Sequence, residues 1–104
     1  MGIGVDIVKI DRFNNVDEYF INRIYTQEEI NFYNTLSSDK KVVFLASRWA
    51  VKEAIFKANN QKDYLSYGCV NDINGKPYIV NHPEIKVSIS HDGDYAIAFV
   101  IIND

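Results

Sequence analysis

Residues 40–58 read KKVVFLASRWAVKEAIFKA, and this stretch decides the fold because it predicts one long helix. It lies within residues 5–67, which contain neither glycine nor proline to interrupt a helix. On a helical wheel of about 100° per residue, one apolar stripe comprises Val42, Leu45, Ala46, Trp49 and Phe56. A second stripe on the opposite side, bordered by Arg48, comprises Phe44, Val51 and Ile55. A helix with two apolar sides is expected at the centre of a fold or at an interface between copies.

One acidic residue, Glu53, falls near the middle of the first stripe, with Lys57 one turn later. A carboxylate on an apolar face is costly unless a cation compensates it. The helix alone leaves two interpretations open. Glu53 either pairs with Lys57 at i,i+4, or it serves a functional site.

The N-terminal segment predicts a strand that contains an aspartate. Ile3, Val5 and Ile7 alternate with smaller or polar residues, as a strand requires. Aspartate is disfavoured within strands, and the glycines at positions 2 and 4 leave space for a ligand or another backbone. Asp6 is therefore either a cap at the end of the strand or a group that faces a ligand.

The two carboxylates together suggest a metal site. If the first strand lies beside the long helix, Asp6 and Glu53 meet. Oxygen ligands of this kind suit Mg²⁺, which is typically held by one or two carboxylates, substrate phosphates and waters. Three cations on the same helix are then placed to bind phosphate oxygens: Arg48, Lys52 and Lys57.

The rest of the chain predicts further helices and then strands. A short helix is expected over 17–24, and a second from Thr26, whose spacing to Glu29 is that of a capping box, to about Leu36. Residues 37–39 would cap the long helix. Asn74-Gly75 and Asp92-Gly93 predict two hairpins. The expected fold class is α+β, an antiparallel sheet with helices packed on it.

The last predicted strand, residues 95–102, is apolar on both faces. One face comprises Tyr95, Ile97, Phe99 and Ile101, and the other Ala96, Ala98, Val100 and Ile102. Such a strand is expected to be buried on both sides.

Composition limits the functional classes. With 104 residues we expect one domain, 1–104. The net charge of −3 argues against nucleic acid as a partner, and no apolar run reaches membrane-spanning length. The N-terminus lacks the basic start of a signal peptide and the myristoylation pattern. The single cysteine, Cys69, allows no internal disulfide, so a cytoplasmic location is expected.

Candidate polar groups outside the helix are few. Ser90 and His91, next to each other beside a predicted turn, offer donors suited to a phosphate, although a histidine in a turn is commonly without function. His82 is interpreted as a surface residue. A small basic group comprises Lys9, Arg12 and Arg23. It is either a solvated face or a dock for an acidic partner.

Three blocks of the chain, taken in order, resemble the holo-[acyl-carrier-protein] synthases, the small type of 4'-phosphopantetheinyl transferase. They are GIGVDI at 2–7 with Asp11-Arg12-Phe13, FLASRWAVKEAIFKA at 44–58, and VSISHD at 87–92 followed by Tyr95-Ala96-Ile97-Ala98. Asn74-Gly75-Lys76-Pro77 matches the hairpin of this family. The blocks span almost the whole chain, and the ordered set is far more specific than any one block.

The resemblance implies a transferase of fatty acid and lipid biosynthesis, which moves 4'-phosphopantetheine from coenzyme A to a serine of apo acyl carrier protein and releases adenosine 3',5'-bisphosphate. It implies that Asp6 and Glu53 bind Mg²⁺ and that Glu53 and Lys57 act in catalysis. Coenzyme A would contact Arg48, Lys57, Lys76, Pro77, Ser90 and His91. Carrier protein would contact Arg12, Phe13 and Arg23. It also implies a homotrimer with active sites between subunits.

The chain departs from this family after Ala58. Members usually have a glycine-rich loop there, whereas here NNQKDY follows, with no glycine before Gly68. The departure concerns the pantetheine side of the site. It also leaves open an alternative, a non-catalytic oligomer that binds coenzyme A and metal with the same fold.

Overall fold

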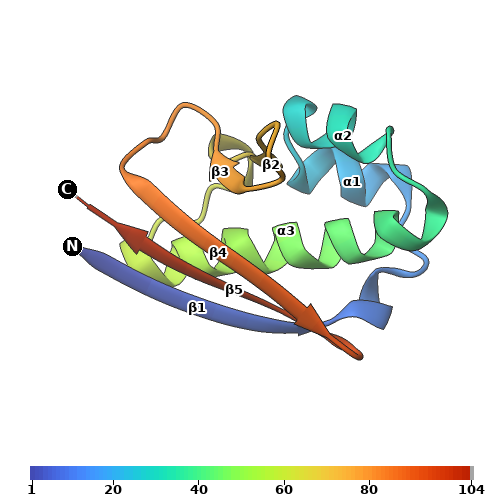
Figure 1. Cartoon of the computed structure of the whole chain (residues 1–104), viewed down its shortest axis with the longest axis horizontal. Helices are drawn as coiled ribbons and strands as arrows, with labels where there is room; N and C mark the ends of the chain where they lie inside the picture. Colours follow the sequence, from blue (N-terminus) through green and yellow to red (C-terminus); the bar gives the residue numbers. More distant parts are fainter. Residues whose placement is uncertain (104) are drawn as a thin grey trace.

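The long helix lies at the centre of the computed structural model, which describes residues 1–103. The elements in chain order are β1 (Gly2–Lys9), the 3-10 turn η1 (Ile10–Phe13), α1 (Glu18–Ile24), α2 (Gln27–Tyr33), α3 (Ser38–Asn59), the 3-10 turn η2 (Tyr64–Ser66), β2 (Cys69–Asn71), β3 (Pro77–Ile79), β4 (Ile85–Asp92) and β5 (Tyr95–Ile102). Figure 1 shows α3 between two layers: the sheet of β1, β5 and β4 on one side, and α1, α2 and the β2–β3 hairpin on the other. The predicted α+β class with an antiparallel sheet is confirmed.

The main sheet has the order β1-β5-β4, and both strand pairs are antiparallel. β4 and β5 form the predicted hairpin, which turns at Gly93 with a φ of +57°. The Asn74-Gly75 hairpin is also present, but β2 ends at Asn71, two residues earlier than expected. The reason is Asp72, whose Oδ1 accepts hydrogen bonds from the backbone amides of Asn74 and Lys76 and so draws them into the turn.

The predicted cap of α2 is present, whereas Ser37 at the start of α3 makes no side-chain capping hydrogen bond. Thr26 and Glu29 form the capping box of α2, and Asp17 accepts a hydrogen bond from the amide of Phe20 at the start of α1. α2 ends at Tyr33 rather than near Leu36, because the Leu36 amide donates to the Tyr33 carbonyl in a tighter turn. None of the helices in residues 1–103 combines the length and the apolar character needed to cross a membrane.

The second predicted stripe of α3 is buried as expected, whereas the first is buried only in part. Its fully buried residues are Ala46, Ala50, Val51, Ala54 and Ile55. Trp49, Glu53 and Phe56 are only half-buried and lie at the rim. The small alanines face the sheet because the strands approach closely there, so the larger side chains fill the edges.

β1 makes the closest of these approaches through its glycines. A Cβ on Gly4 would lie 1.8 Å from the carbonyl oxygen of Ala54, and one on Gly2 would lie 2.4 Å from that of Ala58. Both neighbours are backbone atoms of α3, which cannot move aside as a flexible side chain can. The glycines therefore fix the distance between β1 and α3. They also determine which residues of α3 face Asp6.

One apolar face of the main sheet is exposed in the single chain, contrary to the prediction that β5 is buried on both sides. Ala96, Ala98 and Val100 are fully buried against α3, whereas Ile97 and Phe99 on the outer face are 39% and 41% exposed. β1 extends the same exposed face with Ile3, Val5 and Ile7. The helices pack on the inner face only, so the outer face lacks a second layer within the chain.

Gly4→Ala is expected to lower the free energy of unfolding by more than about 2 kcal/mol, because the added methyl group overlaps the backbone of α3. Urea denaturation followed by circular dichroism measures the change. Gly93→Ala is the matched control: its Cβ meets open space, and only the positive φ opposes it, at a cost of about 1–2 kcal/mol. Equal losses in the two variants would contradict a close contact between β1 and α3.

Candidate active site

Asp6 lies beside the turn of α3 that carries Glu53 and Lys57. The Lys57 Nζ is 3.2 Å from Asp6 Oδ1 and donates a hydrogen bond of 2.9 Å to the carbonyl of Val5. Lys57 therefore bridges to β1, and the open alternative that it pairs with Glu53 is not what the structure has. Glu53 instead accepts a hydrogen bond of 3.1 Å on Oε1 from the Tyr64 hydroxyl.

The two carboxylates have the donor chemistry that Mg²⁺ prefers. Each is contacted through a single oxygen, Asp6 by Lys57 and Glu53 by Tyr64, which leaves a second oxygen on each for a cation. Residues 1–103 hold no cluster of three or more histidine, cysteine, aspartate or glutamate side chains able to bind a metal. A cation here would therefore need phosphate oxygens and waters to complete its shell, as Mg²⁺ in phosphoryl-transfer sites does.

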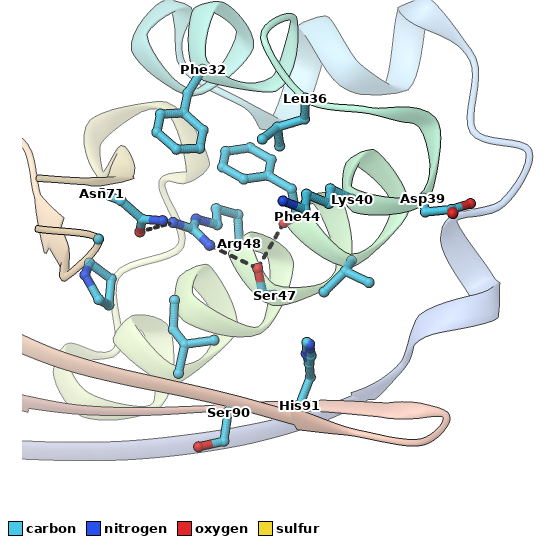
Figure 2. Close-up of a pocket in the computed structure, with 14 residues that line it drawn as sticks. Phe32, Leu36, Asp39, Lys40, Phe44, Ser47, Arg48, Asn71, Ser90 and His91 are labelled. Carbon is cyan, nitrogen blue, oxygen red and sulfur yellow. Dashed lines mark hydrogen bonds between the residues drawn. The ribbon is translucent and has the colours of Figure 1, made fainter. Parts of the chain in front are cut away.

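A groove of about 760 Å³ opens on another side of α3. Figure 2 shows the groove between α3 and β4, with residues of α2 and of the β2–β3 hairpin along its other sides. Four of the residues predicted to bind coenzyme A line it: Arg48, Pro77, Ser90 and His91. Lys57 and Lys76 do not line this groove. The groove combines apolar side chains with a few cationic and polar groups, which is typical of a ligand site.

The groove and the carboxylates lie on different sides of the helix. The groove-lining residues of α3, such as Lys40, Phe44 and Ser47, share one face. At about 100° per residue, Glu53 lies about 130° and Lys57 about 90° around the helix from the centre of this face. The predicted site residues thus form two groups on different sides of α3.

Arg48 is buried, and most of its hydrogen-bond donors are used within the protein. It is 6% exposed and donates a hydrogen bond of 3.1 Å to the Cys69 carbonyl. It also donates to Ser47 Oγ at 3.1 Å and to Asn71 Oδ1 at 2.7 Å (Figure 2). Burial lowers the pKa of its guanidinium, and the neighbouring Cys69 and Glu29 oppose that shift. Since an arginine has five N–H donors, at most two remain for a ligand in the groove.

Ser90 and His91 both line the groove, but their side chains point to opposite faces of β4. Neighbouring residues of a strand point to opposite faces, and the register pairs Ser90 with outer-face Ile97 and His91 with inner-face Ala96. Figure 2 shows the His91 ring directed toward α3 and the Ser90 hydroxyl directed away from it. Only His91 presents its side chain to the α3 side of the groove.

Lys76 and Pro77 follow the Asn74-Gly75 turn at the edge of the groove. Pro77 lines it, whereas Lys76 is exposed and lines a second cavity of about 460 Å³ with His82 and Lys86. His82 is paired with Glu84 at 3.0 Å. The hydrogen bonds of Glu84, first to its own backbone and then to His82, lower the pKa of the Glu84 carboxyl.

Lys52 is not available to phosphate, which corrects the sequence-based hypothesis. Its Nζ lies 2.8 Å from Glu29 Oε1 and donates to the carbonyls of Tyr64 and Tyr67 at 2.8 and 2.7 Å. The side chains of Lys52 and Glu29 are 1% and 0% exposed. Burial lowers the pKa of Lys52, and the charge of Glu29 opposes that shift. The lysine joins α2, α3 and η2 inside the protein.

Replacing Lys52 by methionine is expected to lower the free energy of unfolding by about 3–5 kcal/mol, because Glu29 would remain buried without its cation. Urea denaturation measures the loss, and the double variant Glu29→Gln/Lys52→Met is expected to recover part of it. A Lys52→Met protein of unchanged stability that binds coenzyme A weakly would instead support the original phosphate hypothesis.

The predicted partner-binding residues fall into two classes. Arg12 and Arg23 are exposed, and the Arg23 guanidinium lies 5.3 Å from the ring centroid of exposed Tyr19. Phe13 is 3% exposed and belongs to the core, where its ring lies 6.1 Å from that of Trp49. The contact of Phe13 with a carrier protein stays a prediction, and in the single chain the Phe13 ring closes the end of the core.

Three residues near the site were missed by the sequence analysis. Lys40 lines the groove, Tyr64 holds Glu53, and Glu29 neutralises Lys52. The capping-box spacing identified Glu29 only as a local cap, although its second oxygen also accepts the Cys69 amide. A lysine within a buried stretch of α3 was the one available signal that an acidic partner must exist.

Residues 2–100 match the family model of the 4'-phosphopantetheinyl transferase superfamily. The chain belongs to this superfamily. Among curated relatives, it is 44% identical to a holo-[acyl-carrier-protein] synthase of Geobacillus sp. (strain WCH70), over 98% of this chain and 95% of the relative. It is 39% identical to one of Mycoplasmopsis pulmonis (strain UAB CTIP), over 94% and 86%. The resemblance noted in the sequence is thereby confirmed.

Solved structures of this superfamily have the same fold. A holo-(acyl-carrier-protein) synthase of Bacillus anthracis str. Ames, in complex with CoA (3',5'-ADP), superposes with a TM-score of 0.85 at 33% identity, covering 97% of this chain and 94% of that one. The enzyme of Neisseria meningitidis superposes with a TM-score of 0.87 at 29% identity, covering 99% and 98%. A Helicobacter pylori enzyme in complex with coenzyme A gives 0.77 at 25% identity, covering 97% and 99%.

Proposed function

We propose that this chain transfers the 4'-phosphopantetheine arm of coenzyme A to a serine of apo acyl carrier protein, with Mg²⁺ held by Asp6 and Glu53. Its relatives are named for this activity, and two of the similar structures are described as complexes with coenzyme A or part of it. The observation that carries the proposal is the position of Asp6 beside the Glu53–Lys57 turn of α3. A cytoplasmic location and a role in fatty acid biosynthesis are part of the same proposal.

The reaction cleaves the pyrophosphate of coenzyme A, and adenosine 3',5'-bisphosphate is the leaving group. The serine oxygen of the carrier forms a bond to the β-phosphorus of coenzyme A, and the bond from that phosphorus to the bridging oxygen breaks. The oxygen and its electron pair leave with adenosine 3',5'-bisphosphate. The serine proton passes to a base, either Glu53 itself or a water beside it. Such transfers depend on positioning and charge neutralisation more than on covalent catalysis.

The residues of this chain divide these tasks. Mg²⁺, when bound, supplies charge neutralisation at the pyrophosphate oxygens. Lys57, which is 53% exposed while its amine contacts Asp6, adds a positive charge next to the carboxylates. His91 and Lys40, which line the groove, would hold the phosphates and base of the nucleotide end. Lys76 is exposed at the β2–β3 turn, next to the Pro77 that lines the groove, and would add a further positive charge there.

The separation of the two groups around α3 supports an active site shared between subunits. The groove of one chain would hold the nucleotide, and the carboxylates of its neighbour would face the pyrophosphate. The exposed sheet face provides the surface for such an assembly: Ile3, Val5, Ile7, Tyr95, Ile97 and Phe99 are all at least 39% exposed. An exposed apolar surface of this kind marks an interface. We propose that the chain forms a homotrimer through this surface.

Arg12 and Arg23 are proposed to contact the carrier protein. Both are exposed in the N-terminal part of the chain, one in η1 and one in the last turn of α1. A local positive patch on a chain with a net charge of −3 would attract an acidic partner and set its orientation.

Ile97→Asp is expected to convert the assembly into single chains, because three charges would meet in the apolar contact. Analytical ultracentrifugation is expected to give about three times the 12.0 kDa chain for the parent and a single chain for the variant. Ile73→Asp, at a fully exposed hairpin tip, is the control and keeps the parental mass. A parent protein that sediments as one chain would rule out the proposed trimer.

Glu53→Gln is expected to keep the fold and to reduce transfer by about 100-fold or more, because a charged ligand is replaced by a neutral one. The assay incubates the protein with coenzyme A, Mg²⁺ and apo carrier protein, and mass spectrometry measures the addition of phosphopantetheine. Glu28→Gln, on the exposed side of α2, is the control with the same change of charge. Near-normal conversion by Glu53→Gln would contradict the proposal, and no conversion by the parent would favour the non-catalytic oligomer.

A further inference from the structure

Tyr64 lies in the segment that follows α3, where this chain departs from the glycine-rich loop of the family. Its hydroxyl donates a hydrogen bond of 3.1 Å to Glu53 Oε1. We propose that Tyr64 is a positioning residue, which orients the Glu53 carboxylate so that the other oxygen faces the divalent cation. The inference rests on the proposed function, since it assigns the residue that prepares the metal site.

The ring of Tyr64 is held in place by the helix that carries Glu53. It stacks on the indole of Trp49, with ring centroids 5.5 Å apart and an interplanar angle of 25°. Trp49 precedes Glu53 by four residues, so the two side chains lie on the same face of α3, one turn apart. The indole is itself fixed by the rings of Phe13 and Phe20, at 6.1 and 5.9 Å. The stack therefore places the phenol over the turn where Glu53 lies.

The backbone of Tyr64 is held independently of its ring. Its carbonyl accepts a hydrogen bond of 2.8 Å from Lys52, and the same ammonium holds the carbonyl of Tyr67 and the carboxylate of Glu29. Lys52 is adjacent to Glu53 on α3, so the buried ion pair clamps η2 directly beside the candidate site. Tyr64 is thus fixed through its main chain, its ring and its hydroxyl.

This arrangement has a direct chemical consequence for Glu53. A glutamate on a helix surface has several rotamers, and holding one of them costs conformational entropy. A hydroxyl that donates to one oxygen selects the rotamer and directs the second oxygen outward before any cation arrives. Outer partners of metal-binding carboxylates act in this way, and their loss commonly weakens metal binding 10–100-fold. The alternative is that the hydrogen bond only anchors the loop.

Binding of Mn²⁺, which takes the same oxygen ligands as Mg²⁺, distinguishes these roles without measuring transfer. Free Mn²⁺ is followed by electron paramagnetic resonance in the presence of coenzyme A. Tyr64→Phe keeps the stack on Trp49 and the carbonyl bonded to Lys52, and it is expected to weaken Mn²⁺ binding about tenfold. The matched control is Tyr67→Phe, which removes a hydroxyl that accepts from Asn59 at 3.2 Å and touches no carboxylate. It is expected to bind Mn²⁺ as the parent does.

Each other outcome has a defined meaning. If Tyr64→Phe binds Mn²⁺ like the parent, whatever its melting temperature, the hydroxyl is at most a structural anchor and the inference fails while the proposed function stands. A Tyr64→Phe protein that no longer melts cooperatively would likewise show an anchor and overturn the inference. If the parent protein binds no Mn²⁺ with coenzyme A present, the proposed metal site fails and the role of Tyr64 fails with it.

Discussion

The contact between β1 and α3 is the constraint on which the rest of the structure depends. Gly2 and Gly4 bring the strand against the backbone of the helix at Ala58 and Ala54, closer than any residue with a Cβ would allow. Asp6 continues the same face of the strand and reaches Lys57. A carboxylate near the N-terminus and a glutamate in the middle of the chain thereby come to the same end of one helix. The candidate site is a consequence of backbone packing.

A second, buried interaction secures the other side of α3. Glu29 accepts the Lys52 ammonium, the Thr26 amide and the Cys69 amide, so one carboxylate joins α2, α3 and β2. Lys52 in turn holds the two carbonyls of the segment after α3. A buried pair of this kind adds little net stability but is costly to break. The Glu29–Lys52 pair mainly holds the glycine-free loop after α3 in place next to Glu53.

The helix α3 therefore carries the two groups of predicted site residues on different faces. On one face it lines the groove with Phe44, Ser47 and Arg48, and on another it presents Glu53 and Lys57. The exposed apolar sheet face offers a way to combine them, because association of copies would both bury that surface and bring two different faces together. In the proposed trimer, the same geometry would link assembly and catalysis.

The sequence by itself determined the elements and the class of the fold. Hydrophobic periodicity, the capping box at Thr26 and the Asn-Gly and Asp-Gly turns act over short distances, so each can be recognised locally. It also identified Asp6, Glu53 and Lys57 as one candidate group, because charged residues in apolar settings require partners. The tertiary structure alone decided which partners they have. Lys57 contacts Asp6 rather than Glu53. Lys52 forms a buried ion pair with Glu29. The Tyr64 hydroxyl donates a hydrogen bond to Glu53. These choices depend on distances between segments far apart in the chain, which periodicity and spacing do not encode.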